Sequence, residues 1–359
     1  MKHAFVTPLT LGTLMTMSAV ALLACSDTDT PDRRTGGAGQ GTGGVGTAGD
    51  GDGFSNSGDG DSNAGDGSGG ASPGDGGDSG CNKVDFLFVI DNSSSMGPEQ
   101  AALVASFPGF IDTIQSLSGV SDYHIMVADT DEDGKCTPGD DRCTGGFLAL
   151  PPNDVCLGGG SNVCQVQLAG CDIALGAGVI GPLGKDASNR DCMLSGGSRY
   201  ILDTEPDVSS AFACVAQVGL SGHAEERPMD AMVAALSVPL NAPGGCNEGF
   251  LREDAILVVT IISDDPKRED QGEPADWLAA VTAAKGGDVA AAVVLGLVIG
   301  VDDRAAGADE VKGAHWQEFV ELFGDRGLAA DVSAPDYTPF FADAVSIIDT
   351  TCQEFVGPE

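Results

Sequence analysis

One stretch of eleven residues, from Asp85 to Ser95, constrains the fold of this chain more than any other part. Its first half, Phe86 to Ile90, is an unbroken apolar run with β-branched and aromatic members. Such a run is typical of a strand that is buried on both faces of a parallel sheet. The polarity then reverses in a short turn, and a helix is expected to begin near Pro98. Strand, turn and helix in this order indicate an α/β fold.

The turn after this strand offers one carboxylate and two hydroxyls, from Asp91, Ser93 and Ser95. In open α/β sheets, ligands bind beyond the carboxyl ends of the strands, and hard oxygen ligands of this kind suit Mg²⁺ or Ca²⁺. One charge among neutral ligands leaves a bound ion able to accept a further carboxylate from outside. The same residues also suit the start of a helix, where Ser and Asp are favoured caps. The turn alone leaves both interpretations open.

Asp91, Ser93 and Ser95, placed after a buried strand and before a helix, resemble the metal-ion-dependent adhesion site of von Willebrand factor type A (VWA) domains. By pattern the resemblance covers roughly the last three quarters of the chain. It implies a doubly wound, mostly parallel, Rossmann-like sheet that holds a divalent cation. Mg²⁺ is the ion expected first, with Ca²⁺ or Mn²⁺ as alternatives. The ion would capture a protein partner that offers a carboxylate.

The VWA family carries two further ligands, a Thr on a second loop and an Asp on a third. Asp264 follows the apolar run from Ala255 to Ile262 and stands where the family has its Asp; an Asp that caps a strand–helix turn is the alternative. In the second loop Leu220 stands at the Thr position, and Ser221 offers a hydroxyl one residue later. If Ser221 does not reach the ion, water replaces it. A domain with a site degraded in this way would instead serve as a structural envelope or matrix protein.

Apolar periodicity along the rest of the chain predicts alternating strands and helices. Strands are expected at 86–90, 124–128, 199–202, 255–262, 289–301 and 328–332. Helices are expected at 98–117, 206–217, 228–236, 274–285, 316–323 and 339–355. Pro108 is expected to kink or split the first of these helices. The alternation indicates a parallel, doubly wound sheet with right-handed crossovers.

A second acidic pattern suggests calcium. Asp129, Asp131 and Asp133, followed by Gly134, repeat the opening of a calcium-binding loop, and Asp140 stands at its closing position. The closing residue is shorter than the expected Glu, and a strand precedes the loop, which argues against an EF-hand. Carboxylates this dense repel one another without a cation. An acidic, solvated turn is the alternative.

The chain has eleven cysteines, and ten of them lie beyond Cys25. An even number in an exported chain suggests five disulfides; zinc is disfavoured because no Cys-x-x-Cys occurs and the histidines fit no zinc spacing. A Cys-rich insertion is expected at 129–197. Proximity in the sequence suggests three pairs there: Cys136–Cys143, Cys156–Cys164 and Cys171–Cys192. The VWA resemblance, in which the domain ends meet, implies Cys81–Cys352, and Cys214–Cys246 is the pair left over.

The first 24 residues resemble an export signal, with Lys2 followed by a mostly apolar stretch. The stretch ends in Leu-Leu-Ala before Cys25, which resembles the lipobox of bacterial lipoproteins. The resemblance implies cleavage before Cys25, lipidation of that residue and a place in the cell envelope; Ser26 implies the outer membrane or the cell surface. An uncleaved anchor helix is the alternative. Residues 25–80, rich in Gly, Asp and Ser, are expected to form a disordered, lipidated linker before a VWA domain at 81–359.

The net charge of −37, with 17 Lys and Arg residues, argues against nucleic acid as a partner. The same negative charge disfavours direct binding to an anionic lipid surface, so we expect membrane contact through the lipid anchor only. The sequence has no phosphate-binding loop, and its one Gly-x-Ser-x-Gly, at 70–74, lies in the Gly-rich stretch without the strand and helix that such a nucleophile needs. Nothing marks an oriented base or oxyanion hole beside Ser221 and His223. We therefore expect a binding module rather than an enzyme, with a metal-dependent hydrolase as a distant alternative.

Overall fold

The computed structural model describes residues 81–357, except 118, 131–167, 223–225, 266–269 and 309–310. The predicted signal peptide, Cys25 and the predicted linker lie outside the described residues. So do His223, three members of the predicted calcium loop and four insertion cysteines: Asp131, Asp133, Asp140, Cys136, Cys143, Cys156 and Cys164. Within the described ranges, no helix combines the length and apolar character needed to span a membrane.

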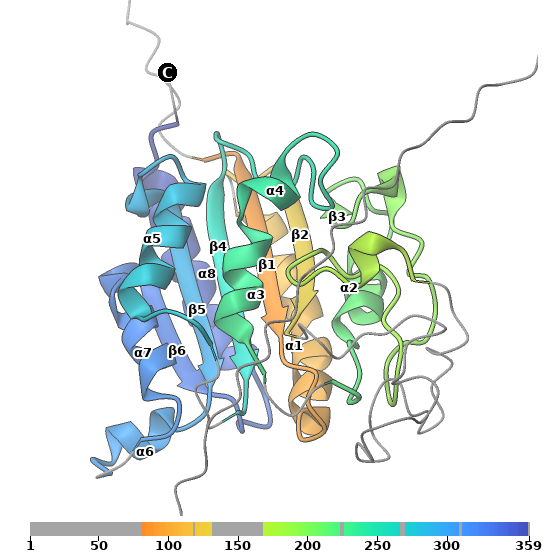
Figure 1. Cartoon of the computed structure of the whole chain (residues 1–359). Helices are drawn as coiled ribbons and strands as arrows, with labels where there is room; N and C mark the ends of the chain where they lie inside the picture. The colour runs from red at the N-terminus through yellow and green to blue at the C-terminus, as the bar shows by residue number, and fades with distance from the viewer. Residues whose placement is uncertain are drawn as a thin grey trace, which may run out of the picture. The chain divides into compact units, whose positions relative to one another are not determined.

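The described chain forms an α/β fold around a six-stranded sheet with the order β3-β2-β1-β4-β5-β6 (Figure 1). Every neighbouring pair is parallel except β2 and β3, which are antiparallel. The strands are β1 (Lys83–Ile90), β2 (Asp122–Asp129), β3 (Ile201–Leu202), β4 (Ile256–Ser263), β5 (Ala292–Val298) and β6 (Gly327–Asp331). The predicted α/β class and mostly parallel sheet are thereby confirmed.

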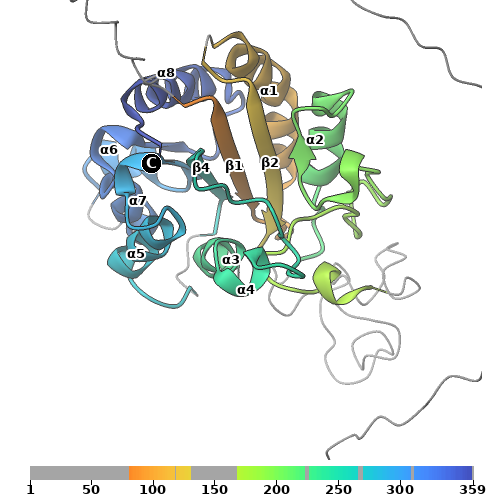
Figure 2. The ribbon, with the colours of Figure 1, turned by 90° about the horizontal axis from the view of Figure 1, so that it is seen from above.

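Helices connect and cover these strands. They are α1 (Gly97–Ser116), α2 (Val208–Ala216), α3 (Pro228–Ala235), α4 (Val238–Asn241), α5 (Pro274–Ala284), α6 (Val301–Ala305), α7 (Ala314–Glu321) and α8 (Thr338–Glu354). Short 3₁₀ turns occur at Gly170–Asp172, Ser195–Gly197, Val289–Ala291 and Gly324–Arg326. Viewed from above, α1, α2 and α8 lie on one side of the sheet and α3, α5 and α7 on the other (Figure 2).

The central strand β1 serves both layers because alternate side chains point to opposite faces. Phe86 and Phe88 enter the core shared with α1, α2 and α8. Leu87 and Val89 enter the core shared with α3, α5 and α7. This explains why the strand is a continuous apolar run rather than an alternating one.

Three local predictions differ from the structure. The split that is one of the two expected effects of Pro108 does not occur, because the residue lies inside α1. Pro108 is exposed, so solvent can bond the carbonyl that loses its amide partner. The strand predicted at 289–301 is shorter, because β5 ends at Val298 and α6 begins at Val301. The short helix α4 was not predicted, since its four residues are too few to show a helical period.

Three disulfides lie in the described part of the chain: Cys81–Cys352, Cys171–Cys246 and Cys192–Cys214. The first joins Cys81, two residues before β1, to Cys352 in α8, as expected from the resemblance. The other two show that the predicted pairs Cys171–Cys192 and Cys214–Cys246 are wrong.

The path of the insertion explains this correction. In the described part of the insertion, the amide of Val179 donates to the carbonyl of Val127 in β2 (2.8 Å), and the amide of Cys192 donates to the carbonyl of Ile180 (2.8 Å). The buried side chain of Asn247, next to Cys246, accepts a hydrogen bond from the amide of Gly178 (3.0 Å) and donates one to the carbonyl of Gly176 (2.9 Å). The prediction pairs cysteines that are neighbours in the sequence, on the assumption that short loops close at the least entropic cost. That assumption fails here because Asn247 holds Cys246 beside the segment that carries Cys171.

Candidate metal centre

The carboxyl ends of β1 and β4 bring the predicted ligands together. The two strands pair in parallel up to Ile90 and Ile262, and the amide of Asp91 then donates to the carbonyl of Ile262 (3.0 Å). Asp91 and Asp264 therefore follow neighbouring strands at the same edge of the sheet. This is the edge at which open α/β sheets bind ligands.

Asp91 is fully buried. Its Oδ1 accepts a hydrogen bond from the amide of Ser93 (2.7 Å), and its Oδ2 accepts one from the hydroxyl of Ser263 (2.7 Å). Burial raises the pKa of Asp91 to about 7; these hydrogen bonds oppose the rise and the nearby charge of Asp264 adds to it. Among the described residues, no Lys or Arg makes an ion pair with Asp91. Its charge is thus held without a positive partner in that part of the chain.

A row of three oxygens lies at the same edge. The hydroxyls of Ser93 and Ser95 are 3.1 Å apart, and Ser95 donates a hydrogen bond to Oδ1 of Asp264 (2.9 Å). Burial also raises the pKa of Asp264, against the lowering effect of the Ser95 hydrogen bond. Ser95 is exposed, and Ser93 and Asp264 are partly exposed. The row is therefore accessible from solvent, whereas the side chain of Asp91 is buried.

The chemistry of these oxygens suits a small divalent cation, because Mg²⁺ is bound by carboxylate, hydroxyl and water oxygens. The Ser93–Ser95 and Ser95–Asp264 separations, 3.1 and 2.9 Å, are those of hydrogen bonds, which a bound ion would replace. No cluster of three or more His, Cys, Asp or Glu side chains suited to a metal occurs among the described residues. A cation here would depend on two carboxylates, two hydroxyls and water.

Ser221 is placed differently from the prediction. It is buried, and its hydroxyl accepts a hydrogen bond from the amide of Lys185 (2.7 Å). Among the described residues, no hydrogen bond joins it to the row of Ser93, Ser95 and Asp264. Leu220, at the position of the family Thr, packs in the core. The second loop thus lies at the site without directing a hydroxyl into the row.

Two residues at this edge were missed by sequence reasoning. Gln100 in the first turn of α1 is buried and bonds the main chain of both loops. Glu226, fully buried just before α3, accepts a hydrogen bond from Thr130, whose hydroxyl also lies 3.5 Å from Oδ1 of Asn92. A Glu shortly before a Pro-initiated helix is a weak signal, because acidic residues are common near helix starts. Gln100 carries no signal at all, since its partners are backbone groups.

Asp129 is the described member of the predicted calcium loop. It ends β2 and is buried. The rest of that loop lies outside the described residues, so the calcium interpretation stays a prediction.

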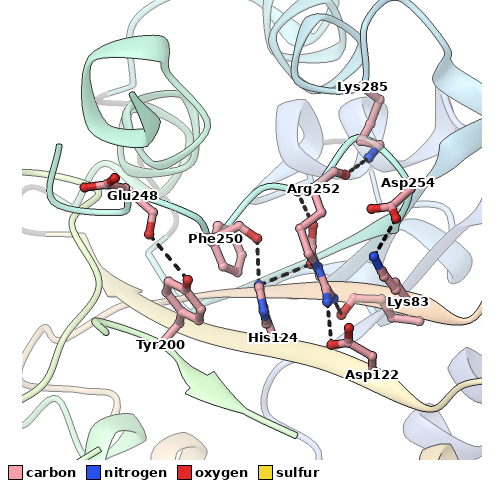
Figure 3. Close-up of polar contacts among 11 residues, drawn as sticks. Lys83, Asp122, His124, Tyr200, Glu248, Phe250, Arg252, Asp254 and Lys285 are labelled. Carbon is pink, nitrogen blue, oxygen red and sulfur yellow. Dashed lines mark hydrogen bonds and ion pairs between the residues drawn. The ribbon is translucent and has the colours of Figure 1, made fainter. Parts of the chain in front are cut away.

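The opposite edge of the sheet also carries acidic residues, but there they are paired with bases (Figure 3). Fully buried Asp85 accepts hydrogen bonds from the amide (2.8 Å) and Nε (2.7 Å) of Arg252. Arg252 also binds Asp122, and Lys285 donates to the Arg252 carbonyl (2.7 Å). Burial raises the pKa of Asp85 to about 6, and the charge of Arg252 limits the rise.

Comparison with known proteins adds little to this geometry. No protein-family model matches the chain, and no curated protein matches its sequence. Among solved structures, the chain is similar to two crystal forms of proximal thread matrix protein 1 from the mussel byssus, each with 9% identity and a TM-score of 0.38. The alignment covers 75% of this chain and 48% of that protein, so the chain spans about half its length. Similarity at this level establishes neither a shared family nor a shared function.

Proposed function

We propose that the chain is a VWA-type binding module that captures a protein partner through a divalent cation. Asp91, Ser93, Ser95 and Asp264 hold the ion, and a carboxylate of the partner completes its shell. Mg²⁺ is the ion expected first, because the proposed ligands are hard oxygens. The module binds and does not turn over its partner, because the ion's open position is filled by the partner's carboxylate.

The observation that carries this proposal is that Asp91 is fully buried and yet makes no ion pair with a Lys or Arg among the described residues. A buried carboxylate without a basic partner is costly, and its pKa rises to about 7 in consequence. A cation bound beside it supplies the missing charge. The exposed hydroxyl of Ser95 leaves the outer side of that ion open to a partner.

Calorimetric titration of the full chain with Mg²⁺, Mn²⁺ and Ca²⁺ tests the cation. Binding with a stoichiometry of one at this edge is expected, and Asp264→Asn should weaken it at least tenfold. Partner capture is tested next by crosslinking in cell-envelope extracts, with and without a chelator. A captured protein whose yield is unchanged by chelation would contradict capture through the ion.

The second loop favours one alternative, a structural envelope protein whose cation site is degraded. The hydroxyl of Ser221 is bonded to Lys185, and Leu220 is in the core, so this loop offers no side-chain ligand in the arrangement described. Ser95→Ala and Ser221→Ala separate the two functions. For a working centre, Ser95→Ala lowers Mn²⁺ affinity about tenfold, since one ligand is lost, and Ser221→Ala leaves it within twofold. For a degraded site, neither variant changes the heat of titration.

We further propose that Cys25 carries the lipid that holds the module at the outer membrane or the cell surface. The support is the lipobox-like end of the apolar stretch before it. Labelling with a fatty-acid analogue in a bacterial host tests this anchor. Label that persists in a Cys25→Ala variant would contradict it.

A further inference from the structure

A buried amide joins the two loops of the candidate centre. Gln100 is 5% exposed. Its Nε2 donates one hydrogen bond to the carbonyl of Asp91 (3.0 Å) and another to the carbonyl of Gly219 (2.9 Å). Its Oε1 accepts a hydrogen bond from the amide of Gly219 (3.3 Å). One side chain of α1 thus bonds both the turn after β1 (91–96, the cation turn) and the second loop (218–222).

The second loop packs against the cation turn through its backbone as well. The amide of Gly222 donates to the carbonyl of Asn92 (2.9 Å). A Cβ on Gly222 would lie 2.2 Å from Oδ1 of Asn92, so only Gly permits this approach. Gly219 has a φ of +94°, a conformation that other residues rarely adopt. The loop is therefore built to lie against the turn even though it sends no hydroxyl to the row.

We infer that Gln100 is a positioning residue for the cation centre, acting through the main chain of Asp91 and Gly219. This inference rests on the proposed function. A binding site needs its ligands held within about 0.5 Å of the productive geometry. The two carbonyls that Gln100 bonds belong to the residue bearing the buried ligand and to the loop beside it. Without the Gln100 amide, the turn and the loop lose the hydrogen bonds through which this side chain joins them.

Gln317 provides a matched control. It lies on α7, is 3% exposed, and its Nε2 also donates to two carbonyls, those of Ile299 (3.1 Å) and Lys312 (3.3 Å). Gln317→Met and Gln100→Met each remove a buried amide while keeping the volume of the side chain. The two variants should lose similar stability, a few degrees in melting temperature. Only Gln100→Met should disturb the centre.

The first readout is hydrogen exchange of the metal-free full chain, followed by mass spectrometry. Gln100→Met should speed exchange in peptides that cover 91–96 and 218–222, and Gln317→Met should speed it in neither. The second readout is calorimetric titration with Mn²⁺, in which Gln100→Met should weaken affinity at least tenfold and Gln317→Met less than twofold. Should Gln100→Met fail to fold, Gln100→Asn serves instead, because it keeps a buried, uncharged amide and shortens its reach to the two carbonyls by one methylene.

Unchanged exchange in both peptides would overturn the inference, whatever the titration shows. Faster exchange with unchanged Mn²⁺ affinity would also overturn it, because Gln100 would then support the fold alone. Failure of the wild-type chain to bind Mn²⁺ would instead refute the proposed function, and the exchange comparison would still decide whether Gln100 holds the two loops together.

Discussion

Asp85 lies near the start of the central strand β1, and Asp91, six positions later, directly follows its end. Both residues are fully buried. At about 3.3 Å per residue, they are separated by about 20 Å. Their surroundings differ in kind. Asp85 is bonded by Arg252 through the amide and the guanidinium, with Lys285 close by. Asp91 is bonded by a hydroxyl and an amide, and the strongest nearby charge is the like charge of Asp264.

The difference is one of neutralisation: Asp85 is paired with a base of its own chain, whereas under our proposal Asp91 is neutralised by a bound cation. At the amino edge the chain neutralises its own carboxylates, and the resulting network locks the start of β1 to the loop before β4. At the carboxyl edge, no Lys or Arg among the described residues makes an ion pair with Asp91 or Asp264. A strongly perturbed titratable group at the edge where open α/β sheets bind ligands is a candidate for a functional site, and the paired acids of the amino edge are its internal control.

The largest effect is expected from Arg252→Met at the amino edge. The change leaves Asp85 buried without its guanidinium and should lower the free energy of unfolding by about 3–5 kcal/mol. Denaturant unfolding of the metal-free chain measures this loss. Mn²⁺ affinity should stay within twofold. A large fall in affinity would show that the two edges are coupled and that the comparison fails.

Asp91→Asn should lower cation affinity about a hundredfold, because the only buried anionic ligand is lost. In metal-free protein at pH 8 the same substitution should leave stability unchanged or raise it, since a costly buried charge is removed. Asp85→Asn should do the opposite: destabilise the fold by depriving Arg252 of its carboxylate and leave affinity unchanged. Equal destabilisation by both variants would mean that Asp91 has a positive partner in the native chain.

Cation affinity should fall with acid in a defined window. The pKa of Asp91 is raised to about 7 in metal-free protein, so below pH 7 a proton competes with the ion, and affinity should drop about tenfold per pH unit. The stability of the metal-free fold moves the other way. The folded pKa exceeds the unfolded one, so the contribution of Asp91 is full below about pH 4 and is lost as pH rises through 7. Titrations at pH 5, 6, 7 and 8 measure the first effect, and a flat profile would contradict it.

The smallest effect is expected from Lys83→Gln. Lys83 and Asp254 form an ion pair at the amino edge whose side chains are 29% and 53% exposed. Exposed pairs contribute at most about 1 kcal/mol, and less in salt. Thermal unfolding should shift by no more than a few degrees. A loss comparable to that of Arg252→Met would show that the amino edge acts as one network rather than through Asp85.

The sequence predicts the sheet better than it predicts the contacts between loops. Runs such as Phe86–Ile90 and Ile256–Ile262 identify the central strands because burial on both faces leaves only apolar residues. Asp91, Ser93, Ser95 and Asp264 then meet because parallel strands end at a shared edge. These inferences depend on period and polarity, which neighbouring residues reveal.

Other features depend on segments far apart in the sequence. The direction of the Ser221 hydroxyl is set by Lys185, and the partner of Cys171 is set by the contacts of Asn247 with the insertion. Gln100 acts through main-chain groups that any residue could supply. No local pattern encodes these contacts, so only the folded chain shows them.

Anomalous diffraction from a crystal soaked in Mn²⁺ tests the central claim most directly. The account predicts one manganese peak bounded by the hydroxyls of Ser93 and Ser95 and the carboxylates of Asp91 and Asp264, with an outer position held by water or a carboxylate. No peak among these four residues at saturating Mn²⁺, with the serine hydroxyls still bonded to each other and to Asp264, would contradict it.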